Sequence, residues 1–178
     1  MEQIISKPQL KFLEAFNSAT SKIFQFNGRS RRSEFWWIMS IVYISSILCT
    51  PVLGFFLEIL MIPLIFRRLH DTGRSGWWYG ISLILKIGFA IAIIYDVFSF
   101  CMNIPTLTNE VRPYEYDKAN VISYIFTIYA KYALWGLVIF IYQIVLLIIF
   151  CIDSDVYEND YGESPKYEIK ESNEEKQD

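Results

Sequence analysis

Side chains that can recognise a charged ligand gather in the stretch RRLHDTGRSGWW, residues 67–78. It contains three arginines and the single histidine of the chain. A helix would place Arg67, His70 and Arg74 on one face, because residues three or four positions apart are neighbours on a helix. Guanidinium groups bind phosphates and carboxylates through paired hydrogen bonds. The stretch therefore predicts an anion site, and beside a membrane the available anion is a phospholipid phosphate.

The same stretch also has a purely structural interpretation. Gly73 tolerates the left-handed conformation that ends many helices, and Ser75 is suited to cap the next helix. Arg67 and Asp71 have the spacing of an ion pair along one helix. Trp77 would then anchor the turn at a membrane surface. Taken alone, the residues leave both interpretations open.

A second arginine cluster, GRSRRSEFWW at residues 28–37, precedes the first apolar segment. If both clusters lie at one membrane surface, Glu34 can pair with Arg67 or Arg68, and residues 158–165 would cover them. The candidate anion- or lipid-binding residues are Arg29, Arg32, Arg67, Arg68, His70 and Arg74. The candidate structural residues of this polar cap are Glu34, Asp71, Ser75 and Asn159.

Known catalytic patterns are missing from the sequence. We find no nucleophile elbow, HExxH motif, phosphate-binding loop or paired carboxylates. His70 and Asp71 are adjacent, so they would point apart on a helix and not form a dyad. The three cysteines lack the spacing of a metal site. We expect no enzymatic activity, no cofactor, no metal and no nucleic-acid partner.

The distribution of apolar residues predicts an integral membrane protein. The chain has 178 residues, of which 53% are hydrophobic. Residues 35–66, 77–102 and 121–152 carry very few charges, and about 20 apolar residues suffice to cross a bilayer. The first twelve residues lack the apolar core of a signal peptide, so we expect the first membrane segment to direct insertion.

We expect an all-α fold with about four transmembrane helices arranged as two hairpins. The predicted spans are 35–50, 52–66, 77–100 and a segment within 121–152, with a polar external loop at 101–120. Pro51 and Gly54 favour a tight hairpin in the first pair, although one long helix broken at Pro51 is the alternative. Arginines flanking these spans place both termini in the cytoplasm.

Two segments flank the transmembrane domain, which we place at residues 27–152. Residues 1–26 include an amphipathic pattern at 9–26, which favours a helix lying in the headgroup plane, or alternatively one packed on protein. Residues 153–178 form an acidic tail with a net charge of −7. We expect this tail to be cytoplasmic and disordered after about residue 166.

Three polar residues fall near the middle of the predicted spans: Glu58, Lys86 and Gln143. An isolated charge at that depth costs at least about 2.5–3.5 kcal/mol, so we predict an ion pair between Glu58 and Lys86, joined by Gln143. This cluster would serve either helix packing or an ion pathway. Cys49 and Cys101 both fall near the external face, where a disulfide is an open alternative.

Taken together, the motifs resemble a bacterial inner-membrane family catalogued as domain of unknown function 805. The two arginine motifs carry the resemblance, and the tail sequence YENDYGESP is similar to the family's closing pattern except at Glu158. The similarity extends over residues 24–166. The chain departs from the family in its short connection after the first span and in its longer polar loop. The resemblance implies a multi-pass inner-membrane protein and no known activity.

Two functional hypotheses follow. In the first, the cytoplasmic arginine cap binds anionic phospholipid headgroups or a partner. In the second, the chain is a small transporter or channel that uses the mid-membrane polar residues and forms homo-oligomers, because four spans enclose little volume.

Overall fold

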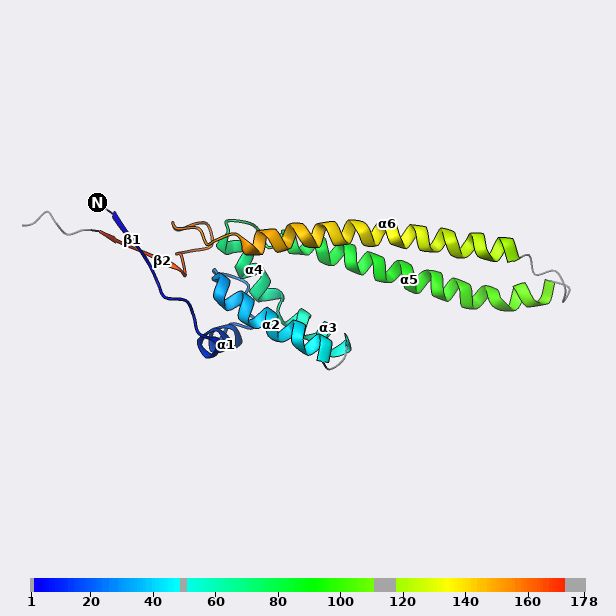
Figure 1. The fold of residues 1–178 in the computed structure, drawn as a ribbon, viewed down its shortest axis with the longest axis horizontal. Helices are drawn as coiled ribbons and strands as arrows, with labels where there is room; N and C mark the ends of the chain where they lie inside the picture. The colour runs from blue at the N-terminus through cyan, green and yellow to red at the C-terminus, as the bar shows by residue number, and fades with distance from the viewer. Residues whose placement is uncertain (1, 49–50, 111–117, 172–178) are drawn as a thin grey trace, which may run out of the picture. The chain divides into compact units, whose positions relative to one another are not determined.

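The computed structural model describes residues 2–48, 51–110 and 118–171 (Figure 1). The elements are β1 (Glu2–Ser6), α1 (Phe12–Ser21), α2 (Arg32–Leu48), α3 (Pro51–Leu60), α4 (Ile62–Asp71), α5 (Trp77–Glu110), α6 (Lys118–Cys151) and β2 (Tyr167–Glu171). They form two compact units. Unit 1 comprises Met1–Tyr79 and Leu146–Asp178, and unit 2 comprises Gly80–Val145.

Two helices are long and apolar enough to cross a membrane. These segments are Trp77–Ser99 in α5 and Phe126–Cys151 in α6, with mean hydropathies of 2.1 and 2.7. Only 6% and 17% of their apolar windows are buried by the protein itself. Large exposed isoleucine and leucine side chains along both helices would be costly in water. Two membrane-spanning helices are therefore the part of the predicted topology that the structure supports.

Unit 2 is held together by contacts between α5 and α6. The Phe89 ring packs edge-on against Tyr132 and Trp135, and Gly88 leaves room for the Trp135 ring. Gln143 donates a hydrogen bond of 2.6 Å to the hydroxyl of Ser82. The unit is thus a helical hairpin whose two arms are joined by aromatic contacts and by side-chain hydrogen bonds.

The predicted polar loop at 101–120 is mostly helix. α5 continues to Glu110, α6 begins at Lys118, and residues 111–117 lie outside the described residues. Extending an existing helix needs no new nucleus, so polar residues do not end it. Each helix has 34 residues and is about 51 Å long. A hydrocarbon core of about 30 Å cannot contain that length, so both helices must extend beyond it.

Residues 35–66 form a hairpin, not one long broken helix. α3 runs back along α2, and Gly54 lies so close to Ser46 that a Cβ atom would meet its Oγ at 2.2 Å. Pro51 begins α3. Proline has no backbone N–H group, which does not matter at this position because the first N–H groups of a helix have no acceptor within it. A second break at Met61 separates α3 from α4. The expected second span is therefore two helices.

α1 is shorter than the predicted segment 9–26 and packs on α2. Ala15 and Ala19, one helical turn apart, are buried. The Phe12 ring meets the Trp37 ring edge-on at 5.7 Å. The structure thus agrees with the alternative prediction for this segment, a helix packed on protein. Contact of its exposed face with headgroups stays a prediction.

Strands β1 and β2 correct the expectation of an all-α chain with a tail disordered after about residue 166. They pair antiparallel from Glu2 opposite Glu171 to Ser6 opposite Tyr167. The polar composition of residues 167–171 resembles that of a disordered segment, but alternating residues supply Tyr167 and Ile169 to one face of the ribbon. Residues 172–178 are not described.

The close approach of α2 and α3 can be tested at Gly54. We expect Gly54→Ala to lower the melting temperature in detergent, because overpacking a tight contact costs about 1–3 kcal/mol. Gly136→Ala is the matched control, since a Cβ atom there meets nothing within 4 Å. Adding Ser46→Gly to Gly54→Ala should recover part of the loss. Equal melting temperatures for the Gly54 and Gly136 variants would contradict the hairpin packing.

Candidate functional site

One buried carboxylate organises the polar cap. Arg29 Nε lies 3.1 Å from Asp71 Oδ1, while Arg68 Nη1 and the hydroxyl of Ser154 both donate to Asp71 Oδ2. The side chains of all four residues are buried. We call Arg29, Arg68, Asp71 and Ser154 the arginine lock. Burial raises the pKa of Asp71, while Ser154 and both guanidinium groups oppose that shift by stabilising the carboxylate.

The remaining guanidinium donors bind backbone carbonyls from the C-terminal part of the chain. Arg68 donates to the carbonyl oxygens of Phe150 and Ile152, at the C-terminal end of α6. These oxygens lack a helical partner because the helix ends there. Arg29 donates to the carbonyls of Asp155, Tyr157 and Gly162. Both arginines are thus occupied by the protein itself.

The predicted ion pair between the two arginine motifs is present. Arg67 Nη1 lies 3.6 Å from Glu34 Oε1, and both side chains are buried. This separation is an electrostatic contact, and none of the three guanidinium nitrogens has a hydrogen-bond partner among the described residues. Glu34 accepts hydrogen bonds from the hydroxyls of Ser18 and Ser30. Burial lowers the pKa of Arg67, and Glu34 opposes that shift.

His70 is a packing residue in this structure. Its ring stacks on Tyr161 with a centroid distance of 3.7 Å and an interplanar angle of 2°. Its Nδ1 lies 3.3 Å from the carbonyl oxygen of Gly28, and its own carbonyl accepts a bond from Asn159 Nδ2. Burial lowers the pKa of His70, which the Gly28 contact partly offsets. Residues from both arginine motifs and from the tail therefore meet, as the sequence predicts.

The turn after α4 follows the structural interpretation closely. Gly73 has a φ of +67°, and the hydroxyl of Ser75 accepts a hydrogen bond from the N–H of Trp77. Arg74 Nη1 donates to the carbonyl of Thr72. One expectation is wrong: Asp71 pairs with Arg68 and Arg29, not with Arg67. The i,i+4 spacing on one helix predicts that Asp71 pairs with Arg67. In the structure Arg29, which is distant in sequence, pairs with Asp71 instead.

The six predicted anion-binding residues do not form one cluster. Arg29 and Arg68 belong to the lock, Arg67 is buried against Glu34, and His70 is stacked on Tyr161. Only Arg32 is both exposed and next to a hollow in the surface. The structure therefore divides the predicted site between a buried core and an accessible groove.

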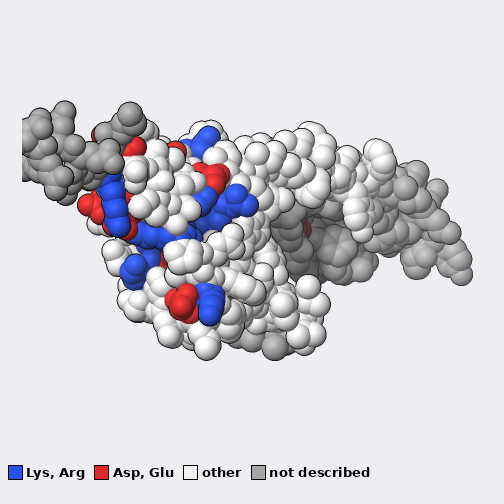
Figure 2. All heavy atoms as spheres, turned by 60° about the vertical axis from the view of Figure 1, so that its left-hand side comes forward, with Lys and Arg blue, Asp and Glu red and all other residues white. Residues whose placement is uncertain are grey.

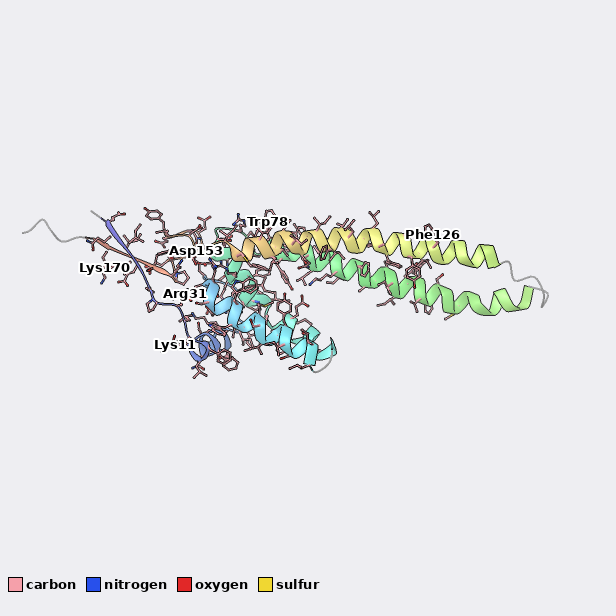
Figure 3. All side chains as sticks on the ribbon, viewed as in Figure 1. Lys11, Arg31, Trp78, Phe126, Asp153 and Lys170 are labelled. Carbon is pink, nitrogen blue, oxygen red and sulfur yellow. The ribbon has the colours of Figure 1, made fainter. Side chains whose placement is uncertain are left out.

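That groove lies at the start of α2 and has a volume of about 410 Å³. Arg31 and Asp153, labelled in Figure 3, both line it. Its lining residues are Gln9, Arg31, Arg32, Ser33, Trp36, Trp37, Ser40, Asp153 and Lys166. We call it the α2 groove. In Figure 2 the charged side chains gather in one region of the displayed face, and most of the remaining surface drawn there carries no charge.

Comparison with known proteins identifies the family. A sequence profile described as "Protein of unknown function (DUF805)" matches residues 40–163, well over half of the chain. The chain belongs to this family. It is also 30% identical over 89 residues to the inner membrane protein YhaH of Escherichia coli, in strain K12 and in O157:H7 alike, covering 40% of this chain and 74% of each relative. No solved structure gives a significant match.

The match confirms the resemblance seen in the sequence and narrows its extent. In this DUF805 protein the matched residues include the RRLHDTGRSGWW motif and most of the YENDYGESP segment. The first arginine motif, residues 28–37, lies before the match begins. Its Arg29 nevertheless completes the lock with Asp71 of the second motif. The family description assigns no activity, and the membrane character comes from the name of the E. coli relatives.

Of the residues predicted to lie near the middle of the spans, Glu58 and Gln143 have hydrogen-bond partners that the sequence did not suggest. Tyr79 donates a hydrogen bond to Glu58 at 3.1 Å in unit 1, and Gln143 bonds to Ser82 in unit 2. Glu58 and Lys86 belong to different units, so their pairing stays a prediction. Cys49 and the side chain of Cys101 lie outside the described residues, while Cys151 is a free, exposed thiol.

Sequence reasoning missed two groups of interacting residues. In unit 2, Asp96 accepts hydrogen bonds from Lys131 and Tyr132. Asp96 is the only acidic residue in 77–102 and Lys131 the only charged residue in 121–152, which could have suggested the pair. In unit 1, Lys166 pairs with Asp153 at the rim of the α2 groove. No local pattern links those two residues.

Replacing the central carboxylate tests the lock. We expect Asp71→Asn to destabilise the protein by about 3–5 kcal/mol, because removing one partner leaves buried charges uncompensated. Asp160→Asn, at an exposed position, removes the same charge as a control. The readout is the melting temperature of the detergent-solubilised protein by tryptophan fluorescence. A shift no larger than that of the control would refute the lock.

His70 gives the cap a pH dependence with a defined sign. Its folded-state pKa is lowered from 6.5, so the unfolded chain binds the proton more readily. Stability from this group is therefore complete above about pH 6.5 and declines as the pH falls below it. We expect the melting temperature to drop between pH 7.5 and 5.5 less steeply in His70→Gln than in the parent chain. Parallel curves would show that His70 does not titrate in this window.

Proposed function

We propose that this DUF805 protein is a multi-pass inner membrane protein whose cytoplasmic cap binds the headgroup of an anionic phospholipid in the α2 groove. The observation that carries the proposal is the composition of the groove. Arg31 and Arg32 stand at the N-terminal end of α2, directly beside Trp36 and Trp37. A cationic end next to an aromatic wall suits a ligand with a charged head and an apolar body.

The chain topology supports placing this groove at a membrane surface. The first turn of α5 and the last turn of α6 both belong to unit 1, so these two helices leave and return on the same side. Arginines concentrate in unit 1 beside them, which is typical of the cytoplasmic face. With α2 as one span and α3 together with the start of α4 as another, four spans result and both termini are cytoplasmic. The inner-membrane name of the E. coli relatives agrees with this location.

The chemistry of the groove matches a phosphodiester. Arg32 is exposed, while Arg31 is buried and uses one nitrogen to donate to the carbonyl of Lys7. Guanidinium groups bind phosphate oxygens through paired, charge-assisted hydrogen bonds, and the first N–H groups of a helix add partial positive charge. Indole rings such as those of Trp36 and Trp37 favour the headgroup layer, where one edge is apolar and the other wet.

The buried arginines are poor candidates for the same role. Arg29 and Arg68 bind Asp71 and backbone carbonyls, so a lipid phosphate would have to displace bonds that hold the cap together. The negative charge of Asp153 in the groove is countered by Lys166. The accessible positive charge in the groove is therefore that of Arg32, with the buried guanidinium group of Arg31 beside it.

Retention of lipid by the purified protein tests the proposal. Phosphatidylglycerol and phosphatidylcholine would each be added to the full chain in detergent and bound lipid counted by native mass spectrometry. We expect phosphatidylglycerol to be preferred, and Arg32→Ala to weaken its binding about ten-fold, equivalent to about 1.4 kcal/mol. Arg31→Ala combined with Arg32→Ala should abolish the preference.

Arg74→Ala is the matched control, because it removes one arginine near the cap but outside the groove. It should leave phosphatidylglycerol binding unchanged. An equal loss in the Arg74 and Arg32 variants would move the site to the turn after α4. Equal binding of both lipids by the parent chain would reject a headgroup site.

A further inference from the structure

The ribbon of β1 and β2 is largely exposed as far as the described residues show. Every residue of β1 is exposed, and Ile4, Ile5 and Ile169 show 48%, 41% and 40% of their surface. Lys170, labelled in Figure 3, lies on this ribbon. A two-stranded sheet is marginal in water without further strands or a covering helix. The ribbon therefore calls for an additional partner.

The outer edge of β2 has the hydrogen-bonding groups to accept another strand. Lys7 N donates to Lys166 O at 2.8 Å, which makes this a hydrogen-bonded pair and sets the phase of the ladder. Groups alternate along a strand, so Glu168 and Lys170 turn their backbone N–H and C=O toward β1. The corresponding groups of Tyr167, Ile169 and Glu171 turn outward. Within the described part of the chain, no strand pairs with that edge.

We propose that β2 pairs antiparallel with β2 of a second copy of this chain, about a two-fold axis at Ile169. The product is a four-stranded sheet in the order β1-β2-β2-β1. Symmetric pairing of one surface with itself is the commonest way in which identical chains associate. This interaction surface is separate from the α2 groove and does not depend on lipid binding.

Charge complementarity selects both the occupant and the register. With Ile169 opposite Ile169 of the second copy, each Glu168 lies opposite the second copy's Lys170. These are non-hydrogen-bonded positions, where side chains approach most closely. Sliding the strands by two residues sets Glu168 against Glu168 or Lys170 against Lys170. If the strands slide by one residue, the outward N–H and C=O groups of one β2 lie opposite residues of the other β2 whose backbone groups point toward β1. Of these registers, only the one centred on Ile169 satisfies both the charges and the backbone.

These charges have no opposite charge across the ladder within one copy. Glu168 lies opposite Ile5 and Lys170 opposite Gln3, and neither joins an ion pair among the described residues. The outer edge of β1 is less suited to self-pairing. Centred on Ile4, it would set Gln3 against Ile5 and Glu2 against Ser6, without any ion pair. The outer edge of β2 is therefore better suited to self-pairing than the outer edge of β1.

Charge exchange between the two positions tests the interface. The full chain would be reconstituted in lipid nanodiscs, and the dimer fraction measured by mass photometry over a range of protein-to-lipid ratios. Glu168→Lys and Lys170→Glu should each weaken dimerisation about ten-fold, because two attractive cross-strand pairs become repulsive. The double variant E168K/K170E restores opposite charges at both positions and should recover the dimer. Glu163→Lys makes the same charge change outside the strand as a control.

Site-specific cross-linking tests the register independently. In a chain whose three cysteines are replaced by serine, Ile169→Cys should form a disulfide-linked dimer on mild oxidation, and Ile4→Cys should not. Unchanged melting temperatures would show that the variants remain folded. A monomeric parent chain, a dimer insensitive to both charge reversals, or cross-linking at residue 4 instead of 169 would each overturn the proposal.

Discussion

The structure depends on neutralising buried guanidinium groups around a single carboxylate. An unpaired buried charge costs several kcal/mol, and Asp71 provides only one negative charge for Arg29 and Arg68. Backbone carbonyls complete the balance, chiefly those at the end of α6 and in the following tail. Because helix C-termini carry partial negative charge, the end of α6 is a suitable counterpart. This requirement brings the tail back to α4 and fixes the cap.

The same requirement separates two roles for arginine within a few residues. Arg29 lies before α2 and faces inward to Asp71, whereas Arg32 opens α2 and faces the groove. A chain that used all its arginines for ligand recognition would leave the ends of its membrane helices unsatisfied. A chain that buried all of them would have no accessible guanidinium group for the headgroup site that we propose. Near the start of α2, Arg29 is therefore a buried structural residue, whereas Arg32 is accessible from the groove.

The sequence allowed prediction of features set by local chemistry or by length. Apolar runs located α5 and α6, Gly73 and Ser75 predicted the turn, and charge opposition predicted the contact of Glu34 with Arg67. Features set by distant partners were missed. Asp71 was assigned by helical spacing to Arg67, although Arg29 reaches it across the fold. Strand β2 was read as disordered because its partner β1 is far away in sequence.

The contacts of the polar cap lower the entropic cost of pairing β1 with β2. Bringing the two ends of so long a chain together would be unfavourable for two short exposed strands alone, since closing a loop costs entropy that grows with its length. Arg29 already binds the carbonyls of Tyr157 and Gly162, which leaves only a few residues between that anchor and β2. On the other side, Trp37 donates to the carbonyl of Leu10 and so anchors the segment after β1. The strands therefore meet at a high effective concentration. The cap therefore favours formation of the ribbon. The free edge of β2 then presents Glu168 and Lys170, whose charges are complementary to those of a second copy in the proposed dimer.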